Sequence, residues 1–196
     1  FPIFAFMIVE GFYKTKDRKK YLLRILIFAL ISEIPFNLYF FKSILYPLYQ
    51  NVLFTFFIAL IMLYILDKIK EINRKILNII LQILIILLFC LISIITFVDY
   101  NAGGILTIVL FYLTKIDINE SKRKILFKKM FQVIGMFYIS TQILEGLILN
   151  INIFNQEISF YRQLISIFSL PIIWLYNEKQ GYYNKYIKLF YYLFYP

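Results

Sequence analysis

The chain has 196 residues, of which 62% are hydrophobic, 20% aromatic and 16% charged, with a formal net charge of +10. Soluble domains are about 45–50% apolar, and disordered chains are poor in aromatic residues, so this composition excludes both classes. One Cys and no His exclude a disulfide scaffold, a His-ligated metal and His-based catalysis within these residues, so no metal is expected. The remaining class is a polytopic membrane protein.

Apolar segments separated by charged gaps predict an all-α bundle of transmembrane helices, because a span needs about 20 mostly apolar residues. In chain order, the expected spans are 1–13, 21–41, 49–66, 76–98, 103–116, 126–149 and 163–176, with the start of an eighth near 186. Membrane strands are disfavoured because segments such as 79–95 are apolar on every face. The prediction is a single transmembrane domain over 1–196, about seven spans plus the start of an eighth.

The chain begins and ends inside apolar runs. We therefore interpret it as a fragment of a longer protein that lacks a leading helix and the C-terminal end.

Basic residues alternate from gap to gap along the chain. Eighteen of the 21 Lys and Arg residues lie in four loops, 14–20, 67–75, 115–129 and 177–188. The positive-inside rule places these loops in the cytoplasm. Topology thus accounts for the positive charge, so no nucleic-acid partner is expected, although the loops suit phosphate-bearing ligands or anionic lipid headgroups.

Two ionisable residues, Glu10 and Arg24, are expected inside the membrane near its cytoplasmic side. Each lies four residues from a flanking lysine, Lys14 or Lys20, so the two side chains are expected at one depth. One interpretation is a structural ion pair between the first two spans. The other is functional: Arg24 binds a phosphate or polarises a carbonyl, and Glu10 orients it.

Polar residues also gather at the outer depth of three different spans. Glu33 lies in the outer half of the second span, Asn51 and Thr55 share one face of the third, and Asp99 closes the fourth. After Asp99, the residues up to Gly104 are expected to form a flexible turn. Buried carboxylates serve acid–base chemistry or hydrogen bonding between helices, and both interpretations stay open here.

A series of short motifs covers almost the whole chain. They are FPIFAF at 1–6 with EGF at 10–12, KY at 20–21 with Arg24, ISEIPFN at 31–37, the segments 51–55 and 99–104, and the segments 176–181 and 190–196. The sequence therefore resembles the TraX family. Asn101 and Glu178 stand where that family usually has glycine.

The resemblance implies an integral membrane acyltransferase in a bacterial cytoplasmic membrane, with acetyl-CoA as co-substrate. The founding member acetylates conjugative pilin, so the implied acceptor is a pilin N-terminus or another cell-surface molecule. The residues expected to be catalytic are Glu33, Asp99, Arg24 and Glu10. Those expected to bind substrate or acetyl-CoA are Asn51, Thr55, Asn177, Gly181 and Lys185.

Two other functions stay open. Spans interrupted by Pro35 and Pro171, with carboxylates near the midplane, are also typical of broken-helix transporters, so a transporter or permease subunit is the main alternative. The chain has no convincing inverted repeat, which such transporters usually have. A scaffold for a surface or secretion complex would tolerate substitution of the polar residues at depth.

Overall fold

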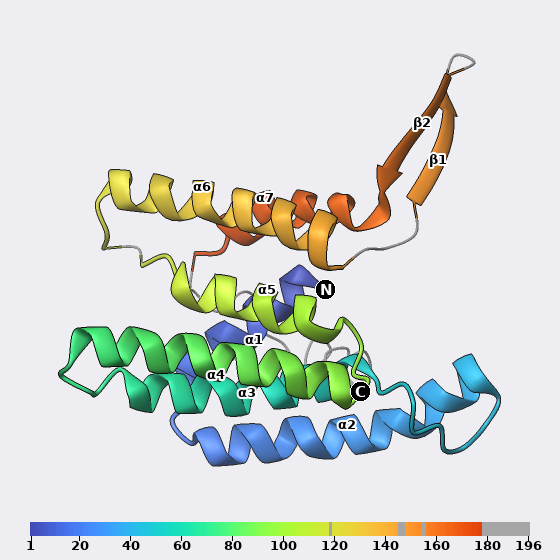
Figure 1. Cartoon of the computed structure of the whole chain (residues 1–196), viewed down its shortest axis with the longest axis horizontal. Coiled ribbons are helices and arrows are strands. Elements are labelled where there is room, and N and C mark those ends of the chain that lie inside the picture. Colours follow the sequence, from blue (N-terminus) through green and yellow to red (C-terminus); the bar gives the residue numbers. More distant parts are fainter. Residues whose placement is uncertain (118, 145–147, 154–155, 178–196) are drawn as a thin grey trace, which may run out of the picture.

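The computed structural model describes residues 1–117, 119–144, 148–153 and 156–177, with the backbone alone over 148–153 and 156–162. Most of this part is helical (Figure 1). The elements are α1 (Pro2–Lys14), α2 (Arg18–Phe41), α3 (Val52–Ile69), α4 (Lys75–Ile95), α5 (Asn101–Leu113), α6 (Lys122–Tyr138), the π-helix η1 (Ile139–Ile143), β1 (Ile148–Ile153), β2 (Gln156–Tyr161), the 3-10 helix η2 (Arg162–Phe168) and α7 (Ser169–Trp174).

Successive helices run in opposite directions, so the loops gather at two ends of the bundle (Figure 1). The loops after α1, α3 and α5 lie at one end, which we call the basic end because they carry the lysines and arginines of 14–20, 67–75 and 115–129. The loops 42–51 and 96–100 lie at the other end, which we call the Asp99 end. The predicted alternation is confirmed for these three basic loops. The fourth, 177–188, lies outside the described residues except for Asn177.

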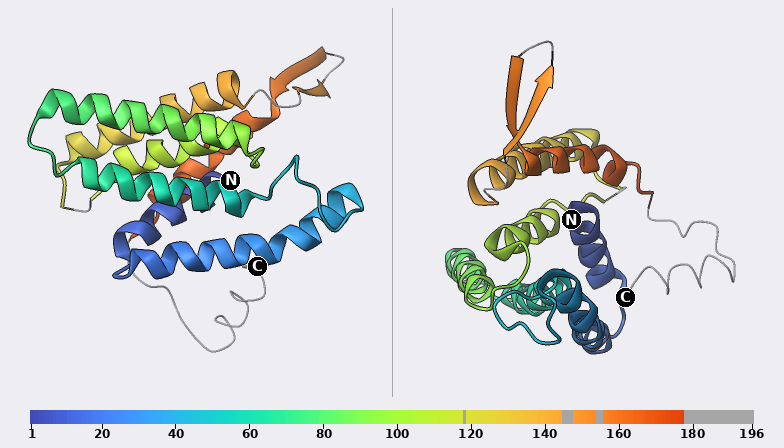
Figure 2. Two further views of the ribbon diagram at one scale, coloured as in Figure 1. Left: turned by 60° about the horizontal axis from the view of Figure 1, so that its bottom comes forward. Right: turned by 90° about the vertical axis from the view of Figure 1, so that its right-hand side faces the viewer.

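The helices form three layers (Figure 2). The helices α2, α3 and α4 make one layer, α1 and α5 the middle one, and α6 with η2 and α7 the third. Contacts of α1 and α5 with α3, and of α4 with α5, join the first two layers, whereas α1–α7 and α5–α6 contacts join the second to the third. The middle helix α5 is the most enclosed, since residues 103–105 and 107–112 are all buried.

Three helices, α2, α3 and α4, are long and apolar enough to cross a membrane. Two shorter apolar helical stretches, Asn101–Leu113 and Gln163–Trp174, accompany them. The outer helices expose large apolar side chains, and α4 buries only Phe89, Cys90 and Ser93. Exposed apolar surface on this scale is costly in water and is expected for faces that meet lipid. The membrane character predicted from composition is therefore confirmed.

Polar side chains define where two of these helices begin. The Asp17 side chain accepts a hydrogen bond from the Lys20 backbone N–H at 3.0 Å at the start of α2, and Asn51 accepts one from Leu53 N–H at 2.9 Å at the start of α3. Such caps satisfy backbone donors that a helix leaves unpaired at its N-terminus. Pro35 lies inside α2 without ending it, and the helix runs on to Phe41.

The predicted span 126–149 is wrong at its C-terminal end. The α-helix ends at Tyr138, a π-helix follows to Ile143, and the backbone then forms an antiparallel hairpin in which Ile148 pairs with Tyr161 and Ile153 with Gln156. The hairpin projects from the Asp99 end of the bundle (Figures 1 and 2). In the sequence, β-branched Ile alternates with Asn across 150–153, a period of two that favours a strand over a helix.

The expected flexible turn at 103–104 is also wrong, because both glycines lie within α5 and are buried. The turn lies just before them, where Tyr100 and Asn101 have positive φ angles of 62° and 40°. Asn tolerates this region better than most residues, which fits Asn at a position where the TraX family usually has Gly. The glycines instead allow close packing, since a Cβ on Gly104 would lie 2.9 Å from both Thr55 Cγ2 and Tyr100 Cβ.

Gly104→Ala should therefore lower the free energy of unfolding by about 1–3 kcal/mol, the usual cost of overpacking a core. Thermal unfolding in detergent measures this loss. Gly11→Ala is the matched control, because its Cβ would meet the hydroxyl end of the Tyr21 side chain, which can move away. A loss at Gly11 as large as that at Gly104 would contradict the packing role of Gly104.

Candidate functional site

A cavity of about 460 Å³ opens at the Asp99 end, between α1, α2, α3 and the loop that follows α4. Its walls are mainly apolar and aromatic, formed by Phe1, Phe4, Pro35, Phe36, Val52, Leu53, Phe56 and Tyr100. Its polar lining residues are Ser32, Asn51 and Asp99. A mostly apolar pocket with a few placed polar groups is the usual composition of a ligand site.

Glu33 lies beside this cavity and joins α2 to the start of α3. Its Oε2 accepts hydrogen bonds from the Asn51 side chain at 2.6 Å and the Asn51 backbone N–H at 3.2 Å, and its Oε1 accepts one from Asn37 at 3.2 Å. Asn51 also donates to the Ala29 carbonyl at 2.9 Å. Both side-chain N–H groups of Asn51 are thus used within the protein, which leaves Oδ1 as the atom it can offer a ligand.

The position of Glu33 follows from the spacing of buried residues along α2. Ile25, Ala29 and Asn37 are the buried residues of this helix, and Glu33 lies midway in the same series of four-residue steps. Residues four apart share one face of a helix. That face packs on α3, so the carboxylate of Glu33 meets the polar N-terminus of α3 instead of lipid.

Asp99 is held by contacts to both its carboxylate and its backbone. Its Oδ1 accepts hydrogen bonds from the Tyr49 hydroxyl at 2.9 Å and the Tyr100 backbone N–H at 3.0 Å, so neither bond occupies Oδ2. The buried hydroxyl of Thr55 donates to the Asp99 carbonyl. The neighbouring loops are joined by the bond from Asp99 N–H to the Gln50 carbonyl at 3.0 Å.

Burial sets the protonation behaviour of this loop. It raises the pKa of the Asp99 carboxyl, and the hydrogen bond from Tyr49 opposes that rise. Burial, together with the hydrogen bond to Asp99, raises the pKa of Tyr49 to about 12. Tyr49 therefore stays a hydrogen-bond donor at neutral pH, and the raised pKa brings Asp99 closer to the range in which carboxylates act as general bases.

Glu10 and Arg24, expected at one depth near the basic end, do not meet. Glu10 is buried and forms ion pairs with Lys14 at 3.4 Å and Lys115 at 3.8 Å. Arg24 is exposed on α2 and has neither a hydrogen bond nor an ion pair within the part of the chain that the structure describes. The predicted pair is wrong because α1 packs mainly on α5, α7 and α3, and because Arg24 lies off the buried face of α2.

A model of the family described as TraX protein matches residues 1–196. The chain belongs to the TraX family. No curated protein and no solved structure matches it.

The other predicted site residues of this TraX chain are placed less fully. Thr55 does not line the cavity and acts on the backbone of Asp99. Asn177 is exposed and follows α7 near the basic end. Gly181 and Lys185 lie outside the described residues. Across the described ranges, no group of three or more His, Cys, Asp and Glu residues is placed to hold a metal ion.

Sequence reasoning missed two residues of the TraX site, Ser32 and Tyr49. Ser32 lines the cavity, and its Oγ is buried without a hydrogen-bond partner within the described ranges. The position of Ser32 next to Glu33 in the motif ISEIPFN is the sequence signal that could have identified it as a site residue. Tyr49 was counted as the first residue of an apolar span, and only the fold shows that its hydroxyl reaches a residue 50 positions away.

Proposed function

We propose that this TraX-family chain is an integral membrane acyltransferase that transfers acetyl from acetyl-CoA to an amine or hydroxyl bound in the Asp99-end cavity. The observation that carries the proposal is the partly buried carboxylate of Asp99 on the wall of that cavity, oriented through Oδ1 by Tyr49. Family membership supports the same reaction class, since the founding member is a pilin acetylase.

The proposed topology has seven spans and the start of an eighth in a bacterial cytoplasmic membrane. The basic end faces the cytoplasm, because lysine and arginine favour that side. The Asp99 end then faces outward, where a pilin N-terminus in a conjugation system, or another cell-surface molecule, is the acceptor. The cytoplasmic end meets acetyl-CoA, and the scheme assigns Arg24, Glu10 and Asn177, together with Gly181 and Lys185 from outside the described residues, to binding of this donor.

In the proposed reaction, Asp99 acts as the general base. It takes a proton from the acceptor as the acceptor nitrogen or oxygen forms a bond to the thioester carbonyl carbon. The carbon–sulfur bond then breaks, and the CoA thiolate leaves and takes up a proton. Ser32 and the free acceptor capacity of Asn51 Oδ1 would orient the acceptor group. Glu33 and Thr55 act as positioning residues, through Asn51 and through the Asp99 backbone respectively.

The test is transfer of radiolabelled acetyl from acetyl-CoA to an external acceptor by the full-length protein in membrane vesicles. Glu33→Ala and Arg24→Ala should both abolish transfer, the first by releasing Asn51 and the second by removing a cation that meets the donor. Glu71→Ala, at an exposed carboxylate after α3, is the control and should keep full transfer. Undiminished transfer in both Glu33 and Arg24 variants would remove this site assignment.

The transporter alternative loses one supporting observation. Pro35 does not break α2, which stays a continuous helix from Arg18 to Phe41. Broken helices at the midplane are the feature by which such transporters bind substrate. Substrate counterflow in liposomes without acetyl-CoA would nevertheless favour transport, whereas labelled acetyl on an external acceptor favours the enzyme.

A further inference from the structure

A second cavity, of about 270 Å³, lies at the basic end between α1, α5, α6 and α7. It shares no lining residue with the cavity at the Asp99 end. Its lining residues with a polar group in the side chain are Glu10, Lys115, Lys129, Gln132, Trp174 and Tyr176. Two ammonium groups and one carboxylate among the lining residues give this cavity a net positive charge.

Lys129 has no acidic partner for its charge among the residues that the structure describes. It is half-buried, its Nζ lies 5.0 Å from the centre of the Trp174 ring, and no described carboxylate comes within ion-pair distance. Its neighbour Lys128 differs, because both oxygens of Glu120 accept hydrogen bonds from Lys128 at 2.7 Å. A half-buried ammonium that lines a cavity and has no counter-ion among the described residues is free to form a charge-assisted hydrogen bond with an anion there.

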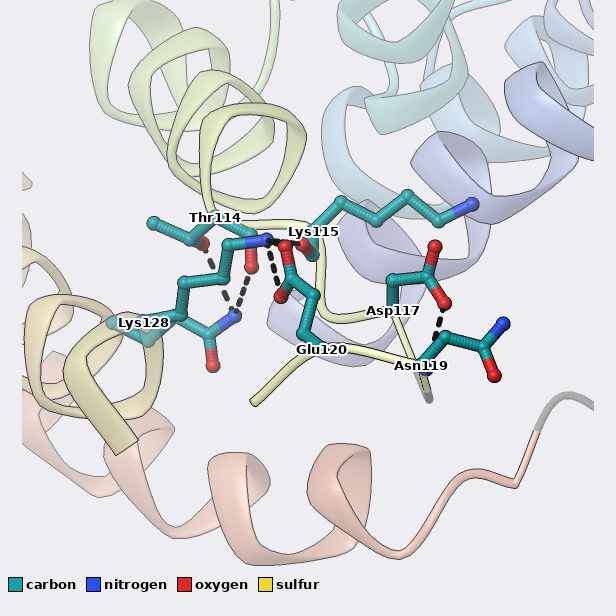
Figure 3. A network of polar contacts seen from close by, with 7 residues as sticks. Thr114, Lys115, Asp117, Asn119, Glu120 and Lys128 are labelled. Carbon is teal, nitrogen blue, oxygen red and sulfur yellow. Dashed lines mark hydrogen bonds and ion pairs between the residues drawn. The ribbon is translucent and has the colours of Figure 1, made fainter. Parts of the chain in front are cut away.

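Lys115 is held in place by its backbone. The ammonium of Lys128 donates to the Lys115 carbonyl, while the Lys115 side chain extends away from this network (Figure 3). Its Nζ lies 4.2 Å from the centre of the Tyr13 ring and 3.8 Å from Glu10 Oε1. The loop after α5 thus fixes the position of a second cation on the cavity wall.

Glu10 contributes an acceptor that the described protein leaves unused. The residue is 7% exposed, and its Oε2 accepts no hydrogen bond from the described residues. Lys14 lies 3.4 Å from Oε2, as an ion pair. The ion pair leaves Oε2 without a hydrogen bond from the described residues, so an N–H or O–H of a ligand in the cavity would be stabilising there.

The far wall of the cavity is rigid before any ligand binds. Gln132 is 2% exposed, and its Oε1 accepts a hydrogen bond from the Trp174 indole N–H at 2.7 Å. The Gln132 amide donates to the Thr114 hydroxyl at 3.1 Å and to the Thr114 carbonyl at 3.3 Å. This chain of bonds ties α5, α6 and α7 together, and a preorganised wall lowers the entropic cost of binding.

We propose that this second cavity binds a phosphate group with a neighbouring N–H or O–H donor, the phosphate on Lys115 and Lys129 and the donor on Glu10. Two sources have this chemistry: CoA, with its phosphates, hydroxyls and amides, and the headgroup of an anionic lipid such as phosphatidylglycerol. With CoA as the ligand, the inference rests on the proposed function. The site would then hold the donor beside Glu10, which lies six residues along α1 from Phe4 in the first cavity. At 1.5 Å per residue this is a separation of about 9 Å.

The test measures binding of unacylated CoA to the full-length protein in phosphatidylcholine nanodiscs by calorimetry. Lys129→Gln and Lys115→Gln keep most of the aliphatic stem and should each weaken binding about tenfold or more, the usual value of a charge-assisted hydrogen bond. Lys129→Arg should keep most of the affinity. Lys124→Gln, exposed on the same helix, is the matched control and should change affinity less than about threefold.

A second arm distinguishes the sources. If the ligand is a lipid headgroup, CoA does not bind, and phosphatidylglycerol added to the nanodiscs raises the unfolding temperature of the native protein but not of Lys129→Gln. If substitution of Lys115 and Lys129 changes neither the affinity for CoA nor the effect of phosphatidylglycerol on the unfolding temperature, the proposed site is wrong. Binding of unacylated CoA requires no reaction, so failure of acetyl transfer alone would reject the proposed function and leave this site standing.

Discussion

Asp99→Asn should lower kcat for acetyl transfer by about 100- to 10,000-fold, the range that loss of a general base produces. Asparagine has nearly the same shape, and its side-chain oxygen can still accept the bonds from Tyr49 and the Tyr100 N–H. The variant therefore removes the proton acceptor while keeping the loop. Initial rates with saturating acetyl-CoA measure the loss, and thermal unfolding checks that the fold is intact.

The dependence of the acetyl-transfer rate on pH distinguishes a carboxylate that acts as a general base from one that is only structural. A base is active when deprotonated, so the rate of the native enzyme should fall as pH falls through the pKa of Asp99. The bond from Tyr49 lowers that pKa, so Tyr49→Phe should move the acid limb of the profile to higher pH. The rate of the Asp99→Asn variant should show no such fall at acid pH. An Asp99→Asn enzyme with the native rate and profile would refute the role of Asp99 as base.

Asn51→Asp should cause the largest loss of stability, about 3–5 kcal/mol in the free energy of unfolding. Aspartate can still cap α3 at Leu53, but it lacks the two N–H groups that reach Glu33 and Ala29. It also places a second carboxylate against Glu33, where like charges repel. Unfolding in detergent at neutral pH measures the effect. Asn78→Asp is the control at the other end of the bundle. It changes only the contacts of the residue 78 side chain with backbone carbonyls near the basic end and with Gln82.

The pairing itself can be tested by exchanging donor and acceptor. In the double variant Glu33→Gln with Asn51→Asp, the new glutamine supplies an N–H to the new carboxylate and the repulsion disappears. The double variant should therefore be more stable than Asn51→Asp alone, by about 0.5–3 kcal/mol of coupling. Additive losses would show that Glu33 and Asn51 do not interact in the way the structure indicates.

The sequence allowed a good prediction of the Asp99 end, for a physical reason. Depth along a helix is fixed by position within the span, so Glu33, Asn51, Thr55 and Asp99 are all predicted at the outer ends of their spans. The structure brings Glu33 to Asn51 and Thr55 to Asp99. Helices α2, α3 and α4 were predictable because their apolar runs are long and their flanks are charged.

The basic end was predicted less well, because depth does not fix which helices are neighbours. Glu10 and Arg24 are predicted at one level but belong to helices that pack little on each other. Lys115 became the partner of Glu10 because α5 enters the middle layer beside α1. The pairing of Glu10 with Lys115 depends on how five helices pack together. The periodicity within any one of these helices does not contain that information. The hairpin was missed because residues 150–162 lie in a gap between two predicted spans, where only the charges were considered.

One feature of the fold bears on how a membrane enzyme could act on substrates from opposite sides. Helix α1 lines both cavities, Phe4 the one at the Asp99 end and Glu10 the one at the basic end. If the two proposals hold, donor and acceptor each enter from their own side and meet along a single helix. Only an acetyl group then crosses the hydrophobic barrier. Such vectorial chemistry requires no alternation of the whole bundle between inward-open and outward-open states.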